Sequence, residues 1–109
     1  MTFDEYQVAA MRTCGCASGV DKIIHGVLGL NSEAGEVSGI LQKVYLGQDI
    51  STEYLMKELG DCMWMIAEIC TAIDCTIEEV CEMNIEKLQK RYPDRFSADK
   101  SLHRAEGDI

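Results

Sequence analysis

Two acidic pairs constrain this chain more than any other feature. Glu33 and Glu36 stand three positions apart, as do Glu58 and Asp61, with twenty-one residues between the pairs. Side chains three positions apart in a helix project from one face, so each pair would present two carboxylates together. Two such helices lying side by side would bring four carboxylates to one place. The spacing therefore predicts a helical fold built around an acidic centre.

Four carboxylates cannot all ionise at one site without compensation. Either some stay protonated, because their neighbours raise their pKa, or a cation lies among them. Oxygen ligands without cysteine or histidine suit a hard cation. We therefore predict a Mg2+ site, in which Mn2+ could substitute, formed by Glu33, Glu36, Glu58 and Asp61.

The composition limits the partners that such a chain can have. Its 109 residues are enough for one domain. It has 10 basic and 19 acidic residues, a net charge of -9, so we expect no binding to nucleic acid polymers or acidic membranes. A small anionic substrate is compatible with this charge if metal ions accompany it. The sequence has no long apolar run and no signal-peptide pattern at its start, which predicts a cytoplasmic protein.

The six cysteines are interpreted as reduced thiols, because nothing in the sequence indicates secretion. Cys62, Cys70 and Cys81 stand among apolar residues at helical spacing and are expected to be small core side chains. The isolated Cys14-Gly15-Cys16 is too short to predict half of a zinc site.

Apolar residues recur at helical period along most of the chain. They predict four helices, at about residues 4–14, 22–45, 52–73 and 76–91, with Ser51 or Thr52 as a cap and a capping box at Thr76. We expect an antiparallel four-helix bundle over residues 1–96, followed by a polar tail at 97–109 that is either poorly ordered or an arm on a partner. The apolar arcs are broad, so we also expect a homo-oligomer, a dimer or tetramer.

The second predicted helix carries more than its glutamates. At 100° per residue, His25, Gly29 and Lys43 lie on the same side as Glu36. At 1.5 Å per residue, His25 and Lys43 are roughly 16 and 10 Å from Glu36 along the axis, which is the scale of an extended nucleotide.

Three glycines of this helix, Gly29, Gly35 and Gly39, indicate either close approach of a neighbour or simple tolerance. On the third predicted helix the acidic side also holds Trp64 and Met65, so it is expected to face a pocket or another subunit rather than open solvent.

The ordered set of motifs resembles the all-α nucleoside triphosphate pyrophosphohydrolases, specifically their MazG-like branch. The resemblance spans roughly residues 3–96. It rests on Tyr6-Gln7, on residues 29–37 with Glu33-x-x-Glu36, on residues 57–64 with Glu58-x-x-Asp61, and on residues 84–93. Many members have another glutamate just before the first motif, where this chain has Ser32. This difference bears on how many metal ions bind and on how the attacking water is positioned.

The resemblance implies hydrolysis of a nucleoside triphosphate to the monophosphate and pyrophosphate. Mg2+ bound by the four carboxylates would neutralise the phosphates and lower the pKa of a bound water, and Glu36 is our candidate for the base that takes the water proton. Cationic and polar groups would bind the substrate. The candidates are Lys87 and Arg91, then Lys43 and Lys57 for phosphate, Asn84 for phosphate or sugar, Trp64 for base stacking, and His25.

Each assignment has a structural alternative. Lys57 can be a surface charge, Trp64 a packing residue and His25 a structural histidine. Lys87 and Arg91 can act only by favourable electrostatic interaction with the carboxyl end of their own helix.

Other functions also remain open at this stage. A phosphoribosyl-ATP or dUTP pyrophosphohydrolase of the same superfamily would use a similar centre, and a non-catalytic, metal-stabilised oligomerisation or regulatory module would keep it without turnover. A di-iron protein is excluded because neither His25 nor His103 follows a glutamate at the required spacing.

Overall fold

The computed structural model describes all residues, 1–109, and consists of helices without strands. The helices are α1 (Phe3–Met11), α2 (Gly19–Tyr45), α3 (Thr52–Ala72), α4 (Ile77–Arg91) and α5 (Ala98–Leu102). The all-α class and the four predicted helices are confirmed. The chain divides into two compact units, Met1–Ile77 and Glu78–Ile109, and we describe each by itself.

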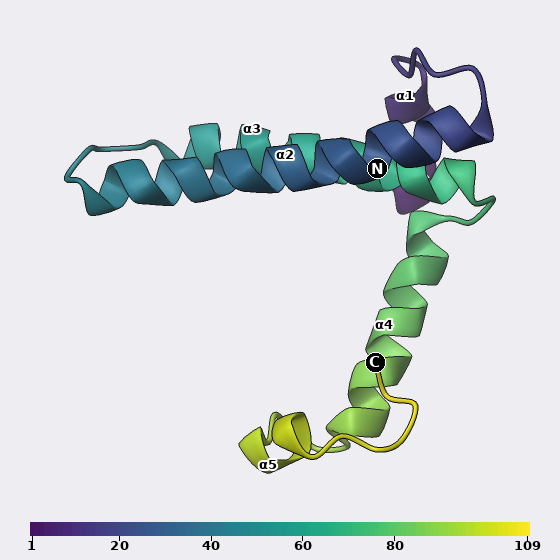
Figure 1. Ribbon diagram of the computed structural model, residues 1–109, viewed down its shortest axis with the longest axis vertical. Coiled ribbons are helices and arrows are strands. Elements are labelled where there is room, and N and C mark those ends of the chain that lie inside the picture. The colour runs from purple at the N-terminus through teal and green to yellow at the C-terminus, as the bar shows by residue number, and fades with distance from the viewer. The chain divides into compact units, whose positions relative to one another are not determined.

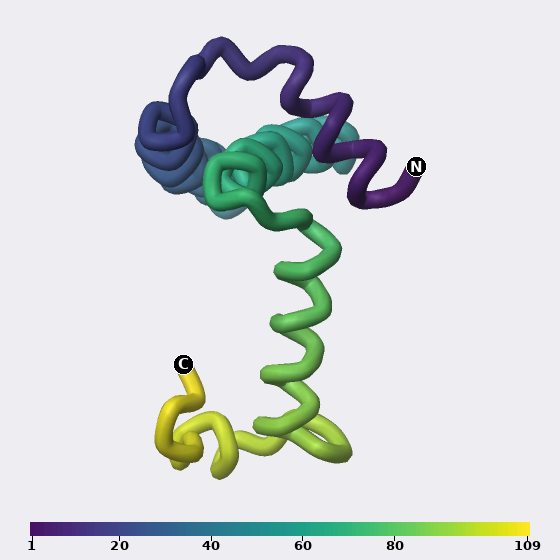
Figure 2. Tube along the Cα trace, turned by 90° about the vertical axis from the view of Figure 1, so that its right-hand side faces the viewer, coloured from purple at the N-terminus to yellow at the C-terminus, as the bar shows by residue number.

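A long antiparallel hairpin of α2 and α3 forms the first unit, with α1 packed against α3 (Figures 1 and 2). Ser18 and Ser51 begin the two long helices, because each side chain accepts a hydrogen bond from a backbone N–H three residues later. Between them Gly47 has a φ of 87°, a conformation that suits glycine in the connecting turn.

The first helix ends at Met11, three residues earlier than the apolar pattern predicted. The carbonyl of Ala10, which would continue the helix, accepts instead from the Thr13 hydroxyl at 3.0 Å and from the Trp64 indole N–H at 2.9 Å. These bonds hold the end of α1 against α3, and residues 12–16 continue as a loop.

The interior of the hairpin contains acidic side chains. On α3 the buried residues are Glu58, Ala67, Glu68 and Cys70. The apolar arc predicted for this helix is only partly covered, since Leu59 is 48% and Ile73 57% exposed. On the acidic side of α3, Glu58 and Glu68 are thus buried within the first unit, whereas Asp61 is exposed.

The glycines of α2 differ in what lies beside them. A Cβ atom on Gly26 would lie 2.7 Å from Ile69 Cγ1, and one on Gly29 would collide with Met65. A Cβ atom on Gly35 or Gly39 would have no other atom within 4 Å. Close approach therefore explains Gly29, whereas Gly35 and Gly39 meet no neighbouring atom that would require a glycine.

The second unit contains most of α4 together with α5 and the carboxyl-terminal residues. The Arg91 guanidinium donates to both carboxylate oxygens of Asp108, at 2.8 and 2.7 Å, and Ser97 caps α5. The tail predicted at 97–109 contains the short helix α5 at residues 98–102, although this segment has no apolar period. None of the five helices is long and apolar enough to cross a membrane.

Candidate functional site

Three of the four predicted carboxylates converge between α2 and α3. Oxygen atoms of Glu33, Glu36 and Glu58 all lie within 4.8 Å of one another. Glu33 and Glu36 are neighbours on α2 because of the helical repeat, and the antiparallel packing places Glu58 of α3 opposite them. The cluster offers oxygen ligands only, which is the donor set that Mg2+ and Mn2+ prefer.

The cluster carries unbalanced negative charge. Glu58 is only 9% exposed. Burial raises the pKa of Glu58, and the neighbouring Glu36, which also shares a hydrogen bond with it, raises this pKa further. A cation among the carboxylates would relieve this repulsion, so the residues present fit a bound divalent metal.

Asp61, the fourth predicted ligand, is exposed and is not part of this group of three. It lies close enough for its charge to raise the pKa of Glu58 and, after burial, that of Tyr6 on α1. Asp61 therefore contributes to the negative potential at the rim of the cluster. Tyr6 therefore lies near Asp61. In the sequence, only the Tyr6-Gln7 motif that resembles the family pointed to this residue.

The two lysines proposed for phosphate in this unit have other partners. Lys43 lies over the Tyr54 ring, 6.0 Å from its centroid. Lys57 is exposed and forms an ion pair of 3.0 Å with Glu53, one turn earlier on α3. Both contacts lie at the surface and are weak enough for a phosphate to displace.

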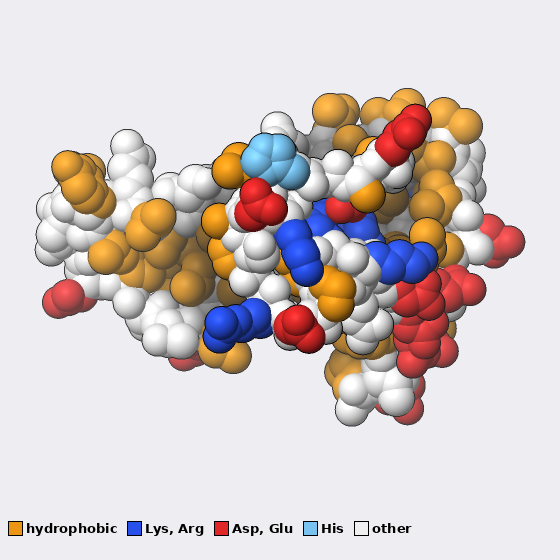
Figure 3. Space-filling model, turned by 90° about the horizontal axis from the view of Figure 1, so that it is seen from below, with side chains coloured by type: hydrophobic (Ala, Val, Ile, Leu, Met, Phe, Trp, Pro, Cys, Tyr) orange, Lys and Arg blue, Asp and Glu red, His pale blue; other side chains and the backbone are white.

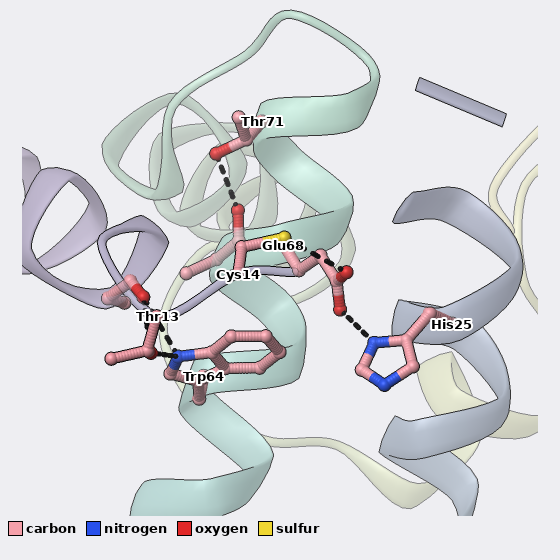
Figure 4. A network of polar contacts seen from close by, with 8 residues as sticks. Thr13, Cys14, His25, Trp64, Glu68 and Thr71 are labelled. Atoms are coloured by element: carbon pink, nitrogen blue, oxygen red, sulfur yellow. Dashed lines mark hydrogen bonds and ion pairs between the residues drawn. The ribbon is translucent and has the colours of Figure 1, made fainter. Parts of the chain in front are cut away.

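His25 and Trp64 lie in a polar network beyond the cluster (Figure 4). His25 Nδ1 is 2.6 Å from a Glu68 carboxylate oxygen, and its ring meets that of Trp64 edge-on. The Trp64 indole N–H donates to Ala10 and Thr13. These contacts give both residues a structural role, and their contact with substrate stays a prediction.

Asn84, Lys87 and Arg91 belong to the second unit. Asn84 is exposed, and Lys87 is half-buried. Basic side chains gather on a face of this unit (Figure 3), where Lys87, Lys90, Lys100 and Arg104 line a cavity of about 600 Å3. Arg91 is held by Asp108, whose carboxylate raises the pKa of the guanidinium, while the pKa of Asp108 is lowered.

Sequence reasoning missed a second group of ligand atoms. Sulfur atoms of Cys14 and Cys16 and a carboxylate oxygen of Glu68 lie within 4.8 Å of one another. The available signal in the sequence was Glu68, an acidic residue among apolar residues on α3, fifty-two positions after Cys16. The sequence does not show that the loop after α1 brings the two cysteines next to Glu68.

Comparison with known proteins defines the class to which this fold and site belong. Residues 25–96 match the model of the MazG nucleotide pyrophosphohydrolase domain. The chain belongs to this family, so the resemblance predicted from the motifs is confirmed. It is also 33% identical over 101 residues to the Gene 37 protein of Mycobacterium phage L5, covering 84% of this chain and 89% of that protein. No solved structure matches.

Proposed function

We propose that this protein hydrolyses a nucleoside triphosphate, a standard or aberrant ribo- or deoxyribonucleotide, to the monophosphate and pyrophosphate in a Mg2+-dependent reaction. The observation that carries the proposal is the convergence of Glu33, Glu36 and Glu58 in a chain of this family. Bound Mg2+ would supply neutralisation of the phosphates and a lowered pKa for water.

The three carboxylates would have different roles because they differ in exposure. Glu58 is nearly buried and Glu33 half-buried, so they would hold the metal in fixed positions together with Asp61 at the rim. Glu36 is exposed, so it could accept a proton from a water molecule arriving from solvent. That water would attack the α-phosphorus, and the bond to the β-phosphate would break to release pyrophosphate.

The substrate carries several negative charges and the protein has a net charge of -9. Binding therefore needs local positive charge in addition to the metal. Lys43 and Lys57 in the first unit are the proposed phosphate ligands. In the second unit, Lys87 and Arg91 stay candidates for phosphate, and Asn84 for phosphate or sugar, on the family resemblance alone. Trp64 and His25 are the proposed contacts of the base.

We further propose that the chain works as a homo-oligomer, a dimer or tetramer. Leu28 and Leu41 on α2 are 67% and 70% exposed, and Met83 on α4 is 71% exposed. Apolar side chains at this density are typical of surfaces that a partner covers. Light scattering coupled to size-exclusion chromatography should give a dimer or tetramer, and a monomer at micromolar concentration would contradict this proposal.

The function is tested by measuring pyrophosphate release from a panel of triphosphates with Mg2+, including dUTP and modified bases, and from phosphoribosyl-ATP. Wild type is compared with Glu36→Gln, Asp61→Asn and, as a matched control, Glu82→Gln on the exposed side of α4. We expect metal-dependent release that both site variants lose and the control retains.

The panel also separates the other functions. Turnover confined to dUTP or phosphoribosyl-ATP would assign the enzyme to one of those narrower activities. No turnover on any substrate, combined with a Mg2+-dependent rise in melting temperature, would contradict the proposal and indicate a metal-stabilised module without catalysis.

A further inference from the structure

A cluster of thiols and a buried carboxylate lies apart from the acidic centre. Cys14 and Cys16, both half-buried, come from the loop after α1, and Glu68, with no exposed surface, comes from α3. One ligand atom from each lies within 4.8 Å of the other two. Figure 4 shows Cys14 reaching toward the Glu68 carboxylate from the side opposite to His25.

The fold holds this loop in place over α3. The Trp64 indole N–H donates to the Ala10 carbonyl at 2.9 Å and to the Thr13 hydroxyl at 3.0 Å. Trp64 and Glu68 stand one helical turn apart on α3. One face of α3 therefore does two things. Its Trp64 holds Thr13, the residue before Cys14, and its Glu68 places a carboxylate beside the thiols.

The two oxygens of Glu68 have different neighbours. One is 3.4 Å from Cys14 Sγ, and the other is 2.6 Å from His25 Nδ1. A fully buried carboxylate is costly unless charge or hydrogen bonds compensate it. Here the imidazole contacts one oxygen and the Cys14 thiol the other. The two sulfur atoms of the group are soft ligands, which a hard cation such as Mg2+ does not select.

The distances fit a thiophilic metal. Two sulfurs bound to tetrahedral zinc at ~2.3 Å are about 3.8 Å apart, which falls within the 4.8 Å that encloses the present group. Ligand carboxylates in metal sites are themselves oriented by hydrogen bonds from neighbouring groups. His25 stands in that relation to Glu68.

We propose that Cys14, Cys16 and Glu68 form a binding site for Zn2+ or another thiophilic divalent transition metal, with His25 orienting the carboxylate from outside the ligand shell. Solvent would complete a four-coordinate site. On binding, each thiol loses its proton to solvent, so the two thiolates match the charge of the divalent metal and the carboxylate leaves a net charge of about -1 on the site. The three ligands do not include Glu33, Glu36 or Glu58, although His25 is also a proposed base contact, so the metal-binding test below does not depend on turnover.

The test is a titration of the full-length, reduced protein with Co2+, followed by absorption spectroscopy. Thiolate ligation to tetrahedral cobalt gives intense sulfur-to-metal charge-transfer bands together with visible ligand-field bands, which oxygen ligation does not. We expect these bands at one Co2+ per chain, and their loss when one equivalent of Zn2+ is added. Cys14→Ser and Cys16→Ser should each weaken Zn2+ binding at least about tenfold, the smallest loss expected even for an outer-shell partner.

Two control variants make the result specific. Cys81→Ser removes a thiol in the other unit and should leave the bands unchanged, and so should Glu36→Gln in the acidic cluster. Circular dichroism and the fluorescence of Trp64, the only tryptophan, verify that each serine variant is folded.

The proposal is wrong if folded wild type shows no charge-transfer bands, if folded Cys14→Ser or Cys16→Ser retains them, or if Glu36→Gln removes them. A Cys14–Cys16 disulfide that forms in place of metal binding and does not reduce under mild conditions would overturn it equally.

Discussion

The two ends of the α2–α3 hairpin use the same pair of helices to build opposite kinds of site. Toward the turn, Glu33, Glu36 and Glu58 gather oxygen atoms only. Toward the open end, Glu68 meets an imidazole and two thiols. Ten residues of α3, roughly 15 Å along its axis, separate the two carboxylates. The two helices position the carboxylates at both ends, and the other ligand atoms at each end decide which cation it can bind.

The glycines of α2 also have different neighbours at the two ends. Gly26 and Gly29 allow the backbones to approach closely beside His25 and Glu68, whereas a Cβ atom on Gly35 or Gly39 would meet no atom within 4 Å. Close packing suits a site that holds its ligands rigidly.

The largest expected effect is at the acidic end. Glu58→Gln removes the negative charge of the most buried carboxylate, so it should lower kcat/KM for triphosphate hydrolysis by about 10²–10³-fold, as removal of a preorganised electrostatic group does. Steady-state kinetics at saturating Mg2+ provides the measurement. Activity within threefold of wild type would show that Glu58 does not serve the reaction.

The next effect is at the open end. His25→Gln removes the ring nitrogen at the Nδ1 position, which lies 2.6 Å from the fully buried Glu68, and loss of a hydrogen bond to a buried charged group should destabilise the fold by roughly 1.5–3 kcal/mol in urea unfolding. His103→Gln, at an exposed pair with Asp99, should change stability by less than about 0.5 kcal/mol. Equal effects of the two variants would contradict a structural role for His25.

A smaller effect tests the close contact between Gly26 and α3. Gly26→Ala places a methyl group 2.7 Å from Ile69 Cγ1 and 3.3 Å from the Met65 carbonyl oxygen. The overpacking should outweigh the gain in helix propensity, leaving a net loss of about 1 kcal/mol. Gly39→Ala meets no atom within 4 Å and should gain up to about 1 kcal/mol. Stabilisation by Gly26→Ala would contradict the close approach of Ile69 and Met65 to Gly26.

The smallest effect is a pH dependence of stability without metal. The folded protein raises the pKa of Glu58 above its ordinary value near 4.5, so it binds this proton more tightly than the unfolded chain does. The contribution of Glu58 to stability is therefore full below pH 4.5 and is lost as the pH rises through the raised pKa.

This dependence is measured as the difference in melting temperature between wild type and Glu58→Gln across this pH range in EDTA. The difference should move against wild type as the pH rises, and Mg2+ should reverse it. A difference that is flat in EDTA would contradict the electrostatic account of the cluster.

Much of the fold followed from periodicity. The four main helices and the convergence of Glu33, Glu36 and Glu58 depend on the 3.6-residue repeat and on short connections, both of which the sequence shows directly. Motif order also identified the family. These features are local or nearly so, which is why they could be predicted.

The remaining features depend on contacts between distant segments. The early end of α1 depends on Trp64, fifty-four residues after Ala10. The thiol cluster exists only because that contact places the loop over Glu68. Which edge of a broad apolar arc becomes buried likewise depends on the partner helix, and periodicity alone does not specify it.

The most direct test of the account is a Mn2+ titration followed by electron paramagnetic resonance, with Mn2+ as a hard substitute for Mg2+. Mn2+ should bind wild type in competition with Mg2+, bind Glu36→Gln at least about tenfold more weakly, and bind Cys16→Ser as tightly as wild type. Equal binding to wild type and Glu36→Gln would contradict the assignment of the hard-cation site to Glu33, Glu36 and Glu58, and weakened binding to Cys16→Ser would contradict the separation of the two sites.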